Sequence, residues 1–306
     1  MTEKVAFVFP GQGSQSVGML HNVAAEHPVI EKTFQEASEV LGYDLWLLAQ
    51  EGPSEKLNQT EYTQPAILVA SVALWRVWQA SNGEKPSILA GHSLGEYSAL
   101  VCAEALSLND AVSLVSLRGR LMQEAVPADV GAMAAILGLD EEVINTLCEA
   151  ESQPHEVVAP ANYNSVGQTV IAGHKAAVLR VMERAKEKQA KRAILLPVSV
   201  PSHCELMKPA ALEFNKALDK ISFKLPLIPV IHNVDVTEHR EEQAIRQALV
   251  EQLYRPVRWV ETVQRMASQG VTTIWECGPG AVLSGLNKRI VATMACQSLS
   301  SGVAVA

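Results

Sequence analysis

The pentapeptide Gly91-His92-Ser93-Leu94-Gly95 constrains the fold of this chain more than any other segment. It follows a short apolar run at 88–90 and precedes a helix-like segment at 96–108. A strand that turns so sharply into a helix needs glycine on both sides of the serine, because a Cβ there would meet neighbouring backbone. The turn exposes the serine Oγ, and the amides that open the helix favour an anion beside it. The segment predicts a serine activated for acyl chemistry; the alternative is a buried serine in a glycine-rich packing turn.

Apolar patterning on either side of this turn predicts an α/β fold with a parallel sheet, because strands alternate with helices along the chain. Strands are expected at 5–9, 88–90, 227–231 and 272–277, and helices at 29–41, 64–79, 96–108 and 109–124.

The pattern changes after Pro127. Four strands are expected at 132–139, 157–161, 168–172 and 192–198, with a turn at 162–167 and helices at 140–151 and 175–189. The order β-α-β-β-α-β is that of a ferredoxin-like unit. We therefore expect a large, discontinuous α/β-hydrolase-like domain at 1–125 and 199–306, into which a small ferredoxin-like domain at 126–198 is inserted.

Composition narrows the partners and the compartment. The chain has 306 residues, 48% of them hydrophobic, and a formal net charge of −8, so nucleic acid is not expected as its main partner. Its five cysteines include no Cys-x-x-Cys pair, so we expect no metal site and no disulfides, and a cytoplasmic location. The longest apolar run, at 65–77, is broken by Ser71 and Arg76, so no membrane span is expected.

A serine nucleophile needs a base, and His203 has the most informative context among the histidines. It lies in Val200-Pro201-Ser202-His203-Cys204, where the chain is expected to leave the small domain and cross the cleft between the domains. An imidazole there can serve as the base or can simply pack at an interface, and the residues alone leave both interpretations open.

Arg118 borders an apolar face of the helix expected at 109–124. Such an arginine is usually solvated, but a guanidinium aimed into the cleft could hold a substrate carboxylate with two parallel hydrogen bonds. The loop Gly11-Gln12-Gly13-Ser14-Gln15 lacks the Lys-Ser/Thr ending of a phosphate-binding loop. It could instead supply a backbone N–H to an oxyanion hole.

Five segments in this order carry a resemblance that covers essentially the whole chain. They are Phe9-Pro10-Gly11-Gln12-Gly13-Ser14-Gln15, Thr63-Gln64-Pro65-Ala66, Gly91-His92-Ser93-Leu94-Gly95-Glu96-Tyr97, Arg118-Gly119 and Pro201-Ser202-His203. Together they resemble the malonyl-CoA:acyl-carrier-protein transacylases, the stand-alone bacterial enzymes of fatty-acid synthesis.

The resemblance implies a role for each matching residue. Ser93 would carry the malonyl group as an ester, and His203 would be the general base and later the acid. Arg118 would hold the malonyl carboxylate. The backbone amides of Gln12 and Leu94 would form the oxyanion hole.

The resemblance also implies that a main-chain carbonyl, centred here on Gln252, orients the histidine in place of a carboxylate. Asn162 and Asn164 would lie near the cleft with a supporting role at most. Malonyl-CoA and acyl carrier protein would be the partners of an expected monomer, and no cofactor would be needed, since the CoA thioester and the phosphopantetheine are substrates. An acidic enzyme must meet an acidic carrier protein through a local basic patch. The candidates for this patch are Lys191, Arg192, Lys288 and Arg289.

Other functions share parts of the pattern. A serine thioesterase or hydrolase of α/β-hydrolase type has Gly-x-Ser-x-Gly but expects a late histidine, whereas the last histidine here is His239. A binding subunit without catalysis would not need Ser93, His203 and Arg118. A trans-acting acyltransferase of a polyketide pathway fits the same residues, so the carrier protein stays open. The exclusion of methylmalonyl groups also stays open; Met122, Val200 and Val282 are equally good as pocket or core residues.

Overall fold

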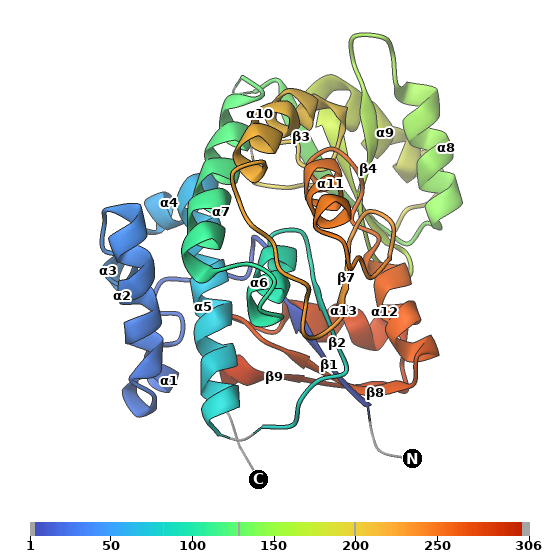
Figure 1. Ribbon diagram of the computed structural model, residues 1–306. Helices are drawn as coiled ribbons and strands as arrows, with labels where there is room; N and C mark the ends of the chain where they lie inside the picture. The colour runs from blue at the N-terminus through green and yellow to red at the C-terminus, as the bar shows by residue number, and fades with distance from the viewer. Residues whose placement is uncertain (1–3, 82, 128, 199, 302–306) are drawn as a thin grey trace.

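Two separate β-sheets organise the protein, as the computed structural model shows for residues 4–81, 83–127, 129–198 and 200–301 (Figure 1). The larger sheet has five parallel strands in the order β7-β2-β1-β8-β9. The smaller sheet has four antiparallel strands in the order β4-β5-β3-β6. The strands of the larger sheet are β1 (Lys4–Phe9), β2 (Ile88–Gly91), β7 (Val230–Ile231), β8 (Val271–Glu276) and β9 (Ala295–Ser298).

Helices cover both faces of the larger sheet because successive side chains of its strands point to opposite sides and both sides are apolar. In β1, Phe7 and Phe9 pack with α5, α6 and α7 in one buried cluster. Ala6 and Val8 pack with α12 and α13 in a second cluster on the other face. The helices before the small sheet are α1 (His21–Glu26), α2 (Val29–Leu41), α3 (Leu45–Glu51), α4 (Ser54–Leu57), α5 (Thr60–Ala80), α6 (Gly95–Cys102) and α7 (Leu108–Glu124). Those after it are α10 (Lys208–Leu218), α11 (Glu242–Gln252), α12 (Trp259–Ser268) and α13 (Val282–Ile290).

The small sheet lies at the upper right of Figure 1, with α8 and α9 on its outer side, and α1 to α4 lie at the opposite edge of the molecule. An apolar cluster between this sheet and its two helices includes Ile136, Ile144, Ile171 and Val181. The elements of this part are β3 (Gly131–Leu137), α8 (Glu141–Glu151), β4 (Val158–Ser165), β5 (Gln168–His174), α9 (Lys175–Glu187) and β6 (Arg192–Leu195).

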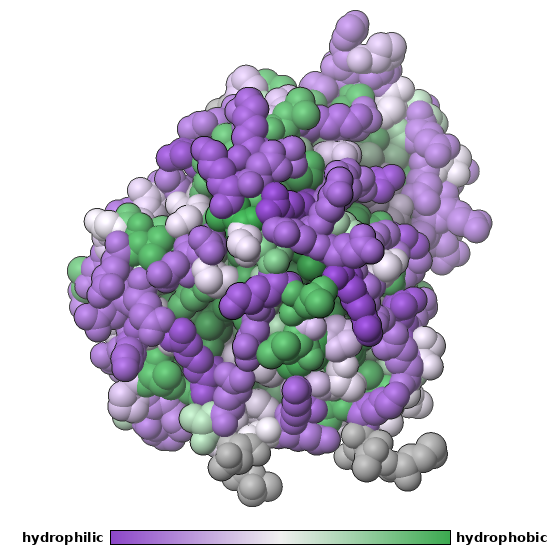
Figure 2. All heavy atoms as spheres, viewed as in Figure 1, coloured by the Kyte–Doolittle hydropathy of each residue, from purple (hydrophilic) through white to green (hydrophobic). Residues whose placement is uncertain are grey.

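The face shown in Figure 2 is mostly hydrophilic, with hydrophobic residues grouped over its middle and lower part. Within the described ranges, no helix is both long and apolar enough to cross a membrane.

The expected alternation of strands and helices is confirmed, but several expected elements were wrong in extent. The helix expected at 96–108 ends at Cys102, because Glu104 takes a left-handed conformation (φ 60°) and Ser107 caps a new helix by accepting a hydrogen bond from the Asp110 N–H. The strand expected at 227–231 keeps only Val230 and Ile231, since proline at 226 and at 229 cannot donate to a ladder.

The strand expected at 192–198 ends at Leu195, since proline at 197 cannot donate to a ladder, and the helix expected at 64–79 begins earlier, at Thr60.

The turn expected at 162–167 was also wrong. β4 continues through these residues to Ser165, and only Val166 and Gly167 form the turn. The strand gains support from outside its own hairpin, because the Tyr163 N–H donates to the Val257 carbonyl at 3.0 Å. No pattern predicted β9 or the helices α10 to α13.

Candidate active site

The serine turn has the tight geometry that its glycines predicted. β2 ends at Gly91 and α6 begins at Gly95. A Cβ on Gly91 would lie 1.8 Å from the carbonyl carbon of Gly95, and a Cβ on Gly95 would lie 2.0 Å from the carbonyl oxygen of Phe9. Ser93 itself has φ 52°, a left-handed conformation that costs a residue with a side chain about 1–3 kcal/mol.

An imidazole reaches this serine from a distant segment. His203 Nε2 lies 2.8 Å from Ser93 Oγ, and His203 Nδ1 lies 2.7 Å from the main-chain carbonyl oxygen of Gln252. Burial, with the positive charge of Arg118 next in importance, lowers the pKa of His203 from 6.5 to about 3. The ring is therefore neutral, and because a carbonyl can only accept, its proton sits on Nδ1. Nε2 then presents a lone pair to the serine hydroxyl, which is the form a general base needs.

Arg118 extends from α7 into the same place and is only 1% exposed. Its Nη1 donates to Gln64 Oε1 at 2.9 Å, and its Nη2 donates to Gln252 Oε1 at 3.0 Å and faces Ser93 Oγ at 3.3 Å. Burial lowers the pKa of the guanidinium, but an arginine so affected still carries its charge at neutral pH. The two glutamine oxygens use one N–H on each terminal nitrogen. The second N–H of Nη2 faces Ser93 Oγ, so a carboxylate that displaces this contact can be met by one N–H from each nitrogen.

A buried carboxylate below the turn completes this hydrogen-bonded group. Glu96, the second residue of α6, is fully buried and accepts from His232 Nδ1 at 2.7 Å, the Asn233 N–H at 2.9 Å and Gln252 Nε2 at 2.9 Å. The side chain of Gln252 thus joins the carboxylate to the guanidinium of Arg118, while its main chain holds the histidine. Sequence reasoning had not assigned roles to Gln64, Glu96, His232 or Asn233. Gln64 and Glu96 stand in the segments that carry the resemblance, whereas nothing marked the other two.

The expected oxyanion amides are those of Gln12 and Leu94. Within the described part of the chain, neither N–H donates to a protein acceptor, and both residues line the cavity that holds Ser93. The Ser93 N–H, by contrast, is occupied, since it donates to Asn233 Oδ1 at 2.7 Å. Gln12 and Leu94 are therefore free to stabilise a negative oxygen beside the serine.

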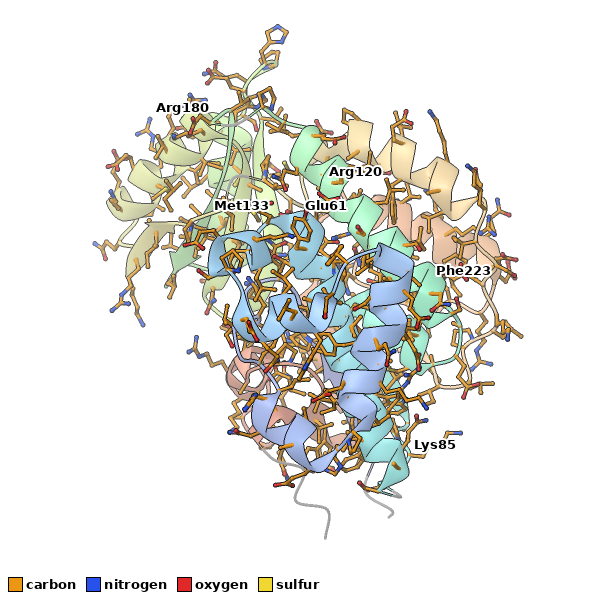
Figure 3. The ribbon with its side chains drawn as sticks, turned by 90° about the vertical axis from the view of Figure 1, so that its left-hand side faces the viewer. Glu61, Lys85, Arg120, Met133, Arg180 and Phe223 are labelled. Atoms are coloured by element: carbon orange, nitrogen blue, oxygen red, sulfur yellow. The ribbon has the colours of Figure 1, made fainter. Side chains whose placement is uncertain are left out.

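The cavity has a volume of about 320 Å³ and lies between the two sheets. The catalytic candidates Ser93, His203 and Arg118 all line it. Met122, Val200 and Val282, which the sequence left as either pocket or core residues, line it as well. From the small sheet, Met133 of β3 also lines the cavity. Figure 3 shows Met133 where that sheet meets the rest of the molecule, and Arg180 on the outer side of the sheet.

Asn162 and Asn164 also line the cavity, from a part of β4 whose register with β5 shifts on either side of Asn162. Such irregularities re-aim side chains beside functional sites. Asn164 Oδ1 accepts from His92 Nε2 at 2.8 Å and so ties the small sheet to the serine turn. Burial lowers the pKa of His92, which keeps the ring neutral in this contact.

The four residues of the expected basic patch are exposed and lie at one edge of the molecule. In the small sheet, Leu137 of β3 lies between Arg192 of β6 on one side and Gln168 of β5 on the other. Arg289 Nη1 donates to Gln168 Oε1 at 3.0 Å, which brings the two halves of the patch to the same end of this sheet. One half of the patch, Lys288 and Arg289, lies in the last turn of α13, and the start of this helix lines the cavity through Val282, Leu283 and Leu286. The other half, Lys191 and Arg192, comes shortly before residues 196–198, which also line the cavity. Each half of the patch is therefore close in sequence to a segment that lines the cavity.

Comparisons with known proteins agree with this geometry. The family model described as an acyl transferase domain matches residues 6–298. A malonyl CoA-acyl carrier protein transacylase of Salmonella typhimurium is 58% identical over 300 residues, which are 98% of this chain and 97% of that protein.

Two solved structures are also similar. The crystal structure of an acyl carrier protein S-malonyltransferase from Vibrio cholerae has a TM-score of 0.95 at 58% identity and covers 97% of this chain and 96% of its own. A malonyl-transacylase solved with a type II PKS acyl-carrier protein has a TM-score of 0.96 at 56% identity, with coverage of 97% and 96%. The chain therefore belongs to the acyl transferase family and, within it, to the malonyl-CoA:acyl-carrier-protein transacylases.

Proposed function

We propose that the protein transfers a malonyl group from malonyl-CoA to the phosphopantetheine thiol of acyl carrier protein, and so supplies chain-extender units for fatty-acid synthesis. One observation carries this proposal: a buried guanidinium, that of Arg118, opens into the same cavity as the Ser93–His203 pair. Malonyl-CoA offers a thioester carbonyl and, one methylene away, a carboxylate. A serine with a fixed cation beside it matches both groups.

The first half-reaction acylates the serine. Ser93 Oγ attacks the thioester carbon while His203 Nε2 takes the hydroxyl proton, and the amides of Gln12 and Leu94 stabilise the oxyanion. The carbon–sulfur bond then breaks, and CoA leaves with the proton from His203. Arg118 exchanges its contact with Ser93 Oγ for the malonyl carboxylate, so the same cation orients the substrate.

The second half-reaction reverses these roles. His203 takes the proton of the pantetheine thiol, the thiolate attacks the ester, and Ser93 Oγ leaves with the proton. Two half-reactions on one serine give ping-pong kinetics. The nucleophile, the base and the anion-stabilising amides complete an acyl transfer between thiols, so we propose that no cofactor takes part.

The acidic acceptor would dock on the patch of Lys191, Arg192, Lys288 and Arg289. The closeness of both halves of the patch to segments that line the cavity supports this, because the pantetheine arm must reach Ser93 from the docked carrier. The relative solved with a type II PKS carrier protein supports a second candidate acceptor, the carrier of a polyketide pathway.

We also propose how the two sheets divide the chain into domains. The strand order β4-β5-β3-β6 supports a ferredoxin-like small domain at 126–198, and the five-stranded parallel sheet supports an α/β-hydrolase-like large domain at 1–125 and 199–306. Residue 199, at one boundary, lies outside the described residues. We also propose that the enzyme acts as a monomer in the cytoplasm, where acyl-CoA and carrier proteins are substrates.

The test offers malonyl-CoA with holo acyl carrier protein, with holo polyketide carrier protein, and with no acceptor. Malonyl transfer to a carrier, abolished by Ser93→Ala, is the expected result, and the faster carrier identifies the pathway. Rapid release of free malonate whether or not an acceptor is present would instead establish a thioesterase.

A further inference from the structure

Asn233 lies directly below the serine turn, two residues after β7 ends, and its side chain is fully buried. Its Oδ1 accepts from the Ser93 N–H at 2.7 Å, and its Nδ2 donates to the Gly91 carbonyl oxygen at 2.7 Å. One side-chain amide thus joins the two ends of the turn.

This contact bears on the strain in the turn. Ser93 has a left-handed conformation, which is unfavourable for a residue with a side chain. Such a residue keeps this conformation only where surrounding contacts hold it there. Asparagine fits the position because it offers one acceptor and one donor side by side; aspartate offers only acceptors, and leucine offers neither. The contact also occupies the Ser93 N–H, so the free amide beside the serine is that of Leu94.

Glu96 holds Asn233 in place from the helix that the turn begins. Its Oε2 accepts from the Asn233 main-chain N–H at 2.9 Å, and its Oε1 accepts from His232 Nδ1 at 2.7 Å. The segment after β7 is therefore anchored to α6 at two successive residues, which holds the main chain of Asn233 beside the turn.

We infer that Asn233 is a positioning residue that holds Ser93 in its strained conformation, aiming Oγ at His203 and leaving the Leu94 N–H for the oxyanion. The inference rests on the proposed function, because it concerns the same serine. Asn233 touches neither the cavity nor the substrate, so its effect must pass through the turn.

The experiment compares wild type with Asn233→Leu, which has a similar shape but no hydrogen-bonding groups. The rate of malonyl-Ser93 formation is measured by rapid quench and intact mass over a range of malonyl-CoA concentrations. We expect the maximal rate to fall about 100-fold, the usual effect of a misplacement near 1 Å. The half-saturating concentration should change less than about threefold, because Arg118 and the cavity are untouched.

Asn287→Leu is the matched control. Asn287 is also fully buried and has one side-chain hydrogen bond, from Trp259 Nε1 at 2.9 Å, outside the cavity. Its loss should lower the midpoint of denaturation but leave the acylation rate per folded molecule within about twofold of wild type. Equal slowing in both variants, or a wild-type rate in Asn233→Leu, would overturn the inference.

A second variant provides a readout that general destabilisation would not move. In Asn233→Asp, burial and the neighbouring Glu96 should raise the pKa of the introduced carboxyl. Once protonated, this carboxyl can donate to the Gly91 oxygen and still accept from the Ser93 N–H. The acylation rate relative to wild type should therefore rise as the pH falls from about 8 to about 5. His232, His92, His203, Glu96 and Arg118 surround the site in both proteins, so the comparison with wild type isolates the effect of the introduced carboxyl. A ratio independent of pH would contradict the inference.

Labelling of Ser93 by phenylmethylsulfonyl fluoride separates this inference from the proposed function. Asn233→Leu should be labelled about 100-fold more slowly than wild type, whatever the natural substrate. If wild type is labelled but takes no malonyl group, the proposed function fails while the labelling comparison still decides the role of Asn233.

Discussion

Replacing Arg118 tests whether its guanidinium selects the malonyl group. The side chain is buried, and each terminal nitrogen donates one N–H to a glutamine oxygen. The two remaining N–H groups can bind a carboxylate once it displaces the contact with Ser93 Oγ. A hydrogen bond to a charged group is worth about 1.5–3 kcal/mol, so the pair contributes about 3–6 kcal/mol for malonyl and nothing for acetyl. At 1.4 kcal/mol per factor of ten, Arg118→Ala should reduce the preference for malonyl-CoA over acetyl-CoA by about 100-fold to 10,000-fold.

The assay presents both thioesters together and measures the two Ser93 adducts by intact mass. The substitution also removes the donor to the Oε1 atoms of Gln64 and Gln252 and a neighbour of Ser93, but these effects reduce both adducts alike and cancel in the ratio. Arg118→Lys is the matched variant, because it keeps the charge and loses the planar fork. It should fall between wild type and Arg118→Ala. If Arg118→Ala keeps the wild-type preference for malonyl, the guanidinium does not bind the carboxylate.

Three further predictions concern the base, the turn and the basic patch. Because the pKa of His203 is about 3, the acylation rate should stay constant as the pH falls to within about one unit of that value and should decline below it. In Arg118→Ala, assayed with acetyl-CoA, this decline should begin at a higher pH, since the cation no longer opposes protonation of His203. Gly95→Ala should lower the free energy of unfolding, measured in urea, by about 3 kcal/mol or more and should abolish the serine adduct, because the new Cβ would lie 2.0 Å from the Phe9 oxygen. A stable, active variant would refute the tight turn. Reversing the charges of Lys191, Arg192, Lys288 and Arg289 should raise the KM for carrier protein in steady-state assays and leave acylation by malonyl-CoA unchanged, whereas equal loss of both half-reactions would argue against docking there.

The serine turn was predictable because its determinants are local. Glycine at 91 and 95 is required by atoms within a few residues or on the adjacent strand, and the strand before it and the helix after it have their own periodicity. The sequence around His203 and Arg118 made them candidates for the base and for the carboxylate ligand. Only the resemblance to the transacylases favoured these roles over an interface histidine and a solvated arginine. The structure brings both side chains to Ser93 from positions 110 and 25 residues away.

The support around these residues could not be predicted in the same way. Asn233 contacts Gly91 across 142 residues, and Glu96 contacts His232 across 136, so nothing in the local pattern marks either pair. A buried glutamate in the first turn of a helix is also indistinguishable, in sequence, from one that simply favours the helix dipole. Asn162 and Asn164 were misplaced in a turn for a related reason: asparagine is rare in strands, and the strand here is completed by the distant residue Val257.

The most direct test of the account is the intact mass of the protein after mixing with malonyl-CoA in the absence of an acceptor. Transfer through a malonyl-serine requires one malonyl group per chain, located on Ser93 by peptide mapping, absent from Ser93→Ala, and removed when holo acyl carrier protein is added. A protein that takes no adduct, or one whose adduct is lost to water as fast with the carrier absent as with it present, would contradict transfer through a malonyl-serine.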